Sequence, residues 1–228
     1  MSRTATFVRC LAGLAALAAA GSSTPAWAKN SSHAEKGIWA ITLRVYDYAQ
    51  VNRSTMRAAE GEATKIFAHA GVDARWVDCP TSRTDWDNFP NCRSAWQAND
   101  YVLRVMPKAM AGLLGKSQDT LGSAMDCGIE LSCAASVFYD RVMSLAGGAS
   151  APVEILLGRA MAHEIGHLLL GANSHSPTGI MRANWSDREF RPDACTELLF
   201  TAEQSRRMRS RLTEQTLTRQ AKAAEVGR

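Results

Sequence analysis

Hydrophobic residues recur along this chain with two different spacings, and the change between them predicts alternating strands and helices. Residues 38–51 are rich in β-branched and aromatic side chains, which is typical of a strand. The apolar residues that follow recur at helical spacing, after a cap at Asn52 or Ser54 and up to Gly71, which closes the helix. Residues 72–78 alternate like a second strand. A strand, a helix and a strand with short links predict a right-handed βαβ unit.

The middle of the chain predicts further strands and one long loop. Strands are expected at 101–106, at 121–126 and at 136–140, with a helix possible from there through Ala146. Residues 79–99 contain two prolines and three large aromatic residues and are expected to form a loop. Long ordered loops often carry function. The alternative is that these aromatic side chains fill the rim of the domain.

Residues 153–170 are apolar nearly all round, which predicts a helix at the centre of the fold. We expect Ser150 to cap this helix. Gly158, Ala162 and Gly166 form a stripe of small residues along it. Because a glycine costs about 1 kcal/mol relative to alanine in a helix, the stripe suggests that another backbone packs closely there.

The C-terminal part of the chain predicts one more helix. It is expected to begin at Thr201, where that threonine and Gln204 have the spacing of a capping box. The polar residues 213–228 are expected to fray.

The first 28 residues have the features of a signal peptide. Arg3 and Arg9 give a basic start, residues 11–20 are apolar, and residues 26–28 offer a small-x-small cleavage site. The apolar run is too short to span a bilayer. We therefore expect a secreted or periplasmic protein in which residues 29–228 form one domain, with no membrane contact after the signal is removed.

Charge and cysteine content narrow the class of protein further. Loss of the two arginines of the signal peptide lowers the formal net charge from +4 to +2, which is too small to argue for nucleic acid as a partner. Export permits disulfides, and the economical pairs are Cys79–Cys92 and Cys127–Cys133, with Cys195 left over. The sequence leaves this connectivity open.

Three of the five histidines lie close together late in the chain, with a spacing that suits a zinc ion. His163 and His167 are four residues apart and therefore project from one face of a helix. Glu164 lies on the adjoining face, where it can act on a metal-bound water. Gly171 can end the helix, so that the chain folds back and His175 supplies a third ligand. Three nitrogens and an open fourth position indicate a catalytic site for one zinc ion.

The alternative is a pair of core histidines that hydrogen bond the backbone, because His-Glu-x-x-His alone recurs by chance. Four features favour zinc. The polar residues of the helix are essentially the motif itself, a glycine follows at the helix end, a third histidine comes soon after, and a signal peptide precedes the domain.

Residues 163–181 resemble the signature of the metzincin zinc endopeptidases, His-Glu-x-x-His-x-x-Gly-x-x-His followed by a methionine turn. The chain looks most like compact bacterial proteins that are predicted to be metzincin-like peptidases. Gly171 comes one residue later than in the signature and His175 two residues later, and residues 176–181 look like the methionine turn. Because His175 comes later than the signature requires, a downstream carboxylate is an alternative third ligand: Asp187, Glu189 or Glu197.

The resemblance implies a mixed α/β (α+β) fold. A twisted mixed sheet with helices would form an upper subdomain at 29–175, with the zinc helix at the cleft, and a small irregular and helical lower subdomain would follow at 176–228. Met181 would form an apolar floor beneath the histidines. Tyr139 is a candidate for the tyrosine that some metzincins place after this methionine. The resemblance also implies that a peptide substrate docks along an edge strand at 121–125, although an interior strand is the alternative there.

Together these features predict a monomeric, exported zinc metalloendopeptidase that acts on peptide or protein substrates. Zinc would activate a water, and Glu164 would take its proton as general base and pass it to the departing amine. Two alternatives stay open. One is a zinc hydrolase acting on cell-wall peptides or other small amides, and the other is a non-catalytic zinc-binding module of the same fold.

Overall fold

The computed structural model describes residues 39–113, 120–125, 134–149, 151–171, 174–185 and 198–226. The expected signal peptide, the expected Cys127–Cys133 pair and Cys195 lie outside these residues, as do the three alternative carboxylate ligands. The expected cap at Ser150 is wrong, because the central helix begins at Val153 and has Pro152 as its N-cap. In chain order the elements are β1 (Ala40–Asp47), α2 (Arg53–His69), β2 (Asp73–Cys79), the short 3-10 helices η2 (Arg83–Asn88) and η3 (Pro90–Arg93), β3 (Asp100–Met106), α3 (Lys108–Leu113), β4 (Gly122–Met125), β5 (Ala134–Phe138), α4 (Tyr139–Ala149), α5 (Val153–Leu170) and α7 (Ala202–Val226).

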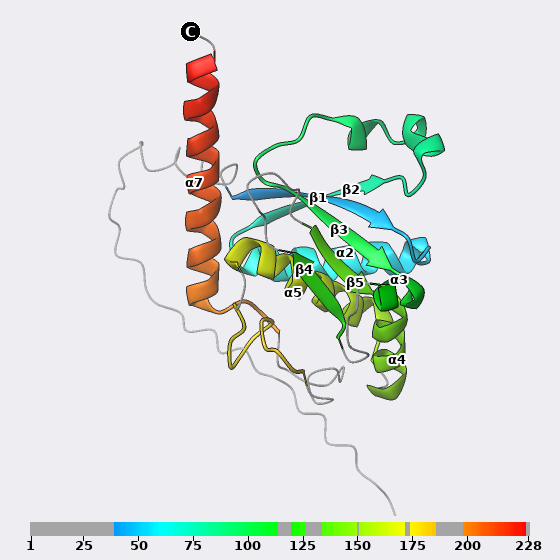
Figure 1. Ribbon diagram of the computed structural model, residues 1–228. Coiled ribbons are helices and arrows are strands. Elements are labelled where there is room, and N and C mark those ends of the chain that lie inside the picture. The colour runs from blue at the N-terminus through cyan, green and yellow to red at the C-terminus, as the bar shows by residue number, and fades with distance from the viewer. Residues whose placement is uncertain are drawn as a thin grey trace, which may run out of the picture.

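The strands form one mixed sheet in the order β2-β1-β3-β5-β4 (Figure 1). Strand β1 pairs in parallel with β2 and with β3, and β3 pairs in parallel with β5. Strand β4 lies at the edge and is antiparallel to β5. The predicted mixed α/β fold is therefore confirmed, and so is the expectation that the strand at 121–125 lies at an edge of the sheet. The division into two subdomains at residue 175 stays a prediction.

Helices α2 and α5 pack together against one face of the sheet, and the main core lies between them and that face (Figure 1). Ile41, Leu43 and Val45 point into this core from alternate positions of β1, as the period of a strand requires. Every residue of α5 is buried or partly buried, which confirms the predicted central helix. A Cβ atom on Gly158 would lie 2.5 Å from the carbonyl oxygen of Ala59 in α2, so the close backbone approach expected at the small-residue stripe is found at this glycine.

The opposite face of β1 is covered by the loop at 79–99, which is organised around the buried side chain of Arg44. Its guanidinium donates to the carboxylate of Asp100 at 2.8 Å, to the carbonyl oxygen of Ser94 at 2.9 Å and to the carbonyl oxygen of Cys92, and it lies over the Trp96 ring. A disulfide joins Cys79 and Cys92, as predicted. A buried cation with several backbone acceptors therefore holds this loop in place, together with the disulfide.

Several boundaries differ from the sequence-based expectation. Strand β1 ends at Asp47, where a strand through residue 51 was expected. Strand β5 ends at Phe138, and residues 139–140, which were expected to end it, begin α4. Helix α7 continues to Val226, where fraying from residue 213 was expected. The difference at α7 has a tertiary cause. Side chains of the expected frayed segment bond to the start of the sheet: Trp39 Nε1 donates to Thr213 at 3.1 Å, and Tyr101 donates to Gln215 at 3.1 Å.

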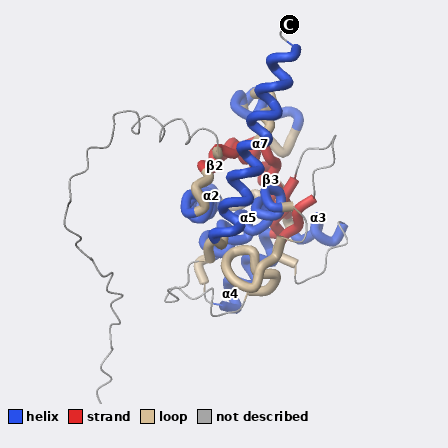
Figure 2. The backbone as a smooth tube through the Cα atoms, turned by 90° about the vertical axis from the view of Figure 1, so that its left-hand side faces the viewer, coloured by secondary structure: helices blue, strands red, loops and turns tan. Residues whose placement is uncertain are grey.

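Helix α7 lies across the end of the sheet where β1 and β3 begin (Figure 2). Its first turn carries the predicted capping box, in which Thr201 Oγ1 accepts from the Gln204 backbone and Gln204 Oε1 accepts from the Thr201 backbone. Among the described residues, no helix is long and apolar enough to cross a membrane.

Candidate metal centre

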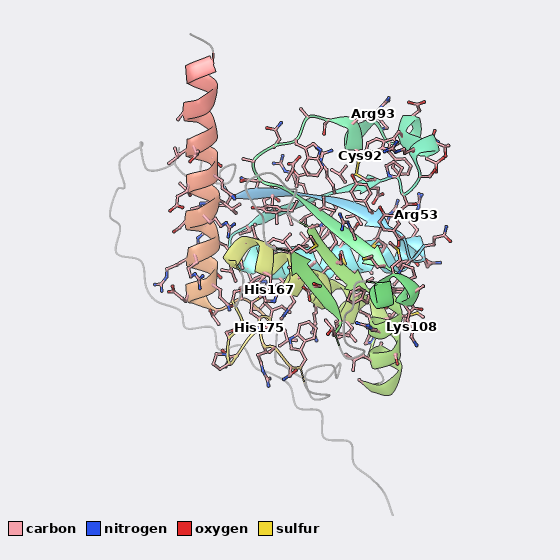
Figure 3. The ribbon with its side chains drawn as sticks, in the orientation of Figure 1. Arg53, Cys92, Arg93, Lys108, His167 and His175 are labelled. Carbon is pink, nitrogen blue, oxygen red and sulfur yellow. A yellow bond between two sulfur atoms is a disulfide. The ribbon has the colours of Figure 1, made fainter. Side chains whose placement is uncertain are left out.

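Three histidines converge at the C-terminal half of α5. His163 and His167 belong to that helix, and His175 belongs to the loop that follows it. Figure 3 labels His167 and His175, which lie near each other. One ring nitrogen from each lies within 4.8 Å of the other two. The sequence spacing explains the first pair, because residues four apart share a helix face. Gly171 ends the helix with φ +91°, as expected, and the chain then returns far enough for His175 to complete the cluster.

The two helical histidines already have a separation that suits a shared cation. Their Nε2 atoms lie 3.1 Å apart. Two nitrogens bound tetrahedrally to zinc at about 2.0–2.1 Å would lie roughly 3.3 Å apart. The donor atoms of His163 and His167 therefore lie close to the spacing that zinc requires, and a ring nitrogen of His175 lies within 4.8 Å of them.

Outer hydrogen bonds orient both of these rings. His163 Nδ1 donates to the carbonyl oxygen of Ile180 at 2.8 Å, and His167 Nδ1 lies 3.0 Å from the hydroxyl of Ser174. The proton on His163 Nδ1 leaves the lone pair of its Nε2 directed at His167 Nε2, and at 3.1 Å a proton or a cation must lie between these two nitrogens. Partners of this kind on the outer nitrogen are the usual support of metal-bound histidine.

Trp185 strengthens the support of His163. Its ring meets the His163 ring edge-on, with centroids 5.5 Å apart, and its Nε1 donates to the same Ile180 carbonyl at 3.3 Å. The Ile180 carbonyl oxygen therefore accepts from both His163 and Trp185, and the Trp185 ring packs on the His163 ring.

The surroundings keep these imidazoles in the neutral form that binds metals. Burial lowers the pKa of His163, and the nearby His175 lowers it further, against the opposing effect of the Ile180 carbonyl. Burial lowers the pKa of His167 to about 4, with added effects from His163 and His175. At neutral pH both rings are therefore uncharged and have a lone pair to offer.

Glu164 lies beside the histidines and faces the edge strand. Its side chain is buried, and it occupies the space next to Gly122 of β4. A Cβ atom on Gly122 would lie 2.5 Å from Glu164 Cγ and 2.6 Å from its Oε1. Helix α5 and the edge strand therefore meet at the carboxylate, which places the candidate general base at the junction of the metal cluster and the sheet edge.

Met181 packs beneath the helix at the level of the two histidines. It is fully buried, and a Cβ atom on Gly166 would lie 2.6 Å from its sulfur. The Met181 carbonyl accepts from the Ser176 backbone at 2.9 Å, which closes the segment 176–181 into a turn. The second glycine of the small-residue stripe thus makes room for a methionine side chain, where a neighbouring backbone was expected.

Tyr139 begins α4 and packs against the main core. Burial raises the pKa of its hydroxyl group, and the neighbouring Asp47, Asp140 and Glu154 raise it further. The suggested role of Tyr139 as a tyrosine at the metal stays a prediction.

Several groups that support the site were not predicted. Ser174, Trp185 and the Ile180 carbonyl act through contacts that no motif encodes. Gln204 was found as part of the capping box, but its bonds to the histidine loop were not foreseen.

The donor set suits a first-row divalent cation, because neutral imidazole nitrogens bind zinc, copper, iron and nickel. His163, His167 and His175 can therefore hold a metal ion. Comparison with models of known protein families finds no match, and comparison with the curated proteins finds none either. The resemblance to metzincins accordingly depends on the motif at 163–181 and on the arrangement of elements around it.

Proposed function

We propose that this protein is an exported zinc metalloendopeptidase with a metzincin-like site. The observation that carries the proposal is the convergence of three imidazoles from α5 and its following loop, next to a buried carboxylate that faces an edge strand. A purely structural pair of histidines needs neither a third imidazole nor an adjacent carboxylate.

His163, His167 and His175 would hold the ion, which when bound supplies Lewis acidity toward water and toward a carbonyl group. Glu164 is the group of this chain that moves protons. Its carboxylate would accept a proton from the attacking water and return it to the amine that leaves. Because Glu164 is packed against Gly122, its position is fixed by the sheet edge as well as by α5.

The shape of the site favours an extended peptide as substrate. Among the described strands, β4 pairs on one side with β5 and has no neighbour on its other side, so an extended chain can be added there. Glu164 lies against the first residue of this strand, which brings a docked peptide next to the candidate general base. The Cys79–Cys92 disulfide supports export, because disulfides persist in oxidising compartments.

The test measures metal content and peptide cleavage on the same preparations. Purified wild type is expected to contain about one zinc per chain and to cleave members of a peptide library. Glu164→Ala is expected to keep the zinc and lose cleavage, and His167→Ala is expected to lose both. His69→Ala serves as the control, since it removes an exposed histidine of α2.

Two outcomes would contradict the proposal. Wild-type protein that takes up no zinc has no such site, and Glu164→Ala cleaving at the wild-type rate excludes the proton-transfer role. Cleavage of peptidoglycan fragments without any cleavage of ordinary peptides would indicate a cell-wall amide as the substrate instead.

A further inference from the structure

His175 is held differently from the other two histidines. His163 and His167 each have an outer partner on Nδ1. The His175 ring is exposed and packs against the rings of the other two histidines, and within the described part of the chain it has no hydrogen-bond partner. The direction of this ring must therefore be set by the backbone on either side of it.

That backbone is held by Gln204 in the first turn of α7. Its side-chain Nε2 donates to Ser176 Oγ at 3.0 Å and to the carbonyl oxygen of Ser174 at 3.5 Å. These two residues flank His175 directly. Gln204 is itself buried, so water does not compete strongly for its amide.

The other end of the same amide is fixed as well. Gln204 Oε1 accepts from the Thr201 backbone at 2.9 Å, and the Gln204 backbone donates to Thr201 Oγ1 at 3.2 Å. A glutamate could serve equally well in this capping box. Only glutamine also offers a donor to the histidine loop, so the residue type present serves both functions.

A second contact from α7 holds the start of the same loop. Arg207 donates from its guanidinium to the carbonyl oxygen of Leu170 at 3.1 Å, at the last turn of α5. The first turns of α7 therefore anchor the chain on both sides of the reversal that brings His175 back to the cluster.

We infer that Gln204 is a positioning residue for the metal site, which fixes the backbone around His175 and makes metal affinity depend on α7. The inference rests on the metal site of the proposed function. It assigns the C-terminal helix a role in building the third ligand, in addition to its role in covering the end of the sheet.

The experiment measures the zinc dissociation constant by competition with a chromophoric chelator at pH 8, together with the Co²⁺ absorption spectrum. Gln204→Glu keeps the cap acceptor and removes the donor, and Gln204→Met removes both. Both variants are expected to bind zinc about tenfold more weakly, the usual effect of losing an outer-shell partner. The Co²⁺ spectrum is expected to change because the third imidazole is displaced.

Thr201→Ala is the matched control, because it removes the cap hydroxyl and leaves the Gln204 donor in place. It is expected to lower Tm, followed by circular dichroism on the metal-free protein, while keeping the wild-type zinc dissociation constant. Ser176→Ala removes the closer acceptor of the Gln204 amide and is expected to weaken zinc binding severalfold. This variant provides the test if the Gln204 variants do not fold.

Wild-type zinc affinity in every folded Gln204 variant and in Ser176→Ala would overturn the inference. Equal losses in Thr201→Ala and the Gln204 variants would also overturn it, since the cap alone would then explain them. Wild-type protein that binds zinc but cleaves no peptide would contradict the proposed function and leave this inference standing. Wild-type protein that binds no zinc would contradict both.

Discussion

The carboxylate of Glu164 fills the space that a side chain on Gly122 would occupy. The built Cβ position at Gly122 lies 2.6 Å from Glu164 Oε1 and 2.6 Å from the Ser136 carbonyl oxygen. Real Cβ atoms do not approach other atoms so closely, so any other residue at 122 must move the carboxylate or the edge strand.

Gly122→Ala is therefore expected to lower peptidase activity by about a hundredfold while the zinc content stays near one per chain, because small displacements of a reacting group have effects of this size. Activity and metal content are measured on the same sample. Gly61→Ala is the control, since nothing lies within 4 Å of a Cβ there. Full activity in Gly122→Ala would show that Glu164 does not need its present position.

Ser174 provides the second prediction. Its hydroxyl lies 3.0 Å from His167 Nδ1, so Ser174→Ala removes the outer partner of a ligand candidate. Zinc affinity is expected to fall about 10- to 100-fold. Chelator competition gives the dissociation constant, and an unchanged value would mean that this hydroxyl does not orient the ring.

The buried Arg44–Asp100 pair provides a prediction about stability. Arg44→Met leaves the Asp100 carboxylate buried without its cation, and removing one partner of a buried pair costs about 3–5 kcal/mol. Urea unfolding measures the loss. Arg75→Met breaks the exposed pair with Asp73 and is expected to change the unfolding free energy by roughly 0–1 kcal/mol. Equal effects in both variants would contradict the central role of Arg44.

Glu60 predicts a pH dependence of stability that is independent of the metal. Burial, and then the neighbouring Asp78, raise the pKa of Glu60 from 4.5 to about 7. The folded protein thus keeps a proton to higher pH than the unfolded chain, so the free energy of unfolding falls as pH rises from about 4.5 to about 7.

Glu60→Gln removes this dependence. At pH 8 the variant is expected to be more stable than wild type by about 1–2 kcal/mol, because solvent screens part of the effect at this partly buried group. At pH 4 the two proteins should unfold at similar urea concentrations. A difference that is the same at both pH values would contradict the linkage.

Local pattern predicted most of the secondary structure correctly because the responsible forces act over a few residues. The central helix at 153–170 was identified to the residue, since its apolar positions and Gly171 mark both its body and its end. The capping box at Thr201 was likewise predicted from side chains within three residues. For α2 the sequence left Asn52 and Ser54 as alternatives, and the structure has Asn52 as the N-cap. The fraying expected after residue 213 was wrong because distant contacts from Trp39 and Tyr101 stabilise α7 there.

The sequence by itself determined the candidate chemistry. A helical repeat places His163 and His167 on one face with Glu164 beside them, and this follows from the geometry of any α-helix. Only the tertiary structure decided whether His175 would reach these two rings. That outcome depends on how residues far apart in the chain meet: Gln204 against the histidine loop, Ile180 against His163, and Glu164 against Gly122. Such contacts form through packing and desolvation, which carry no fixed spacing in the sequence.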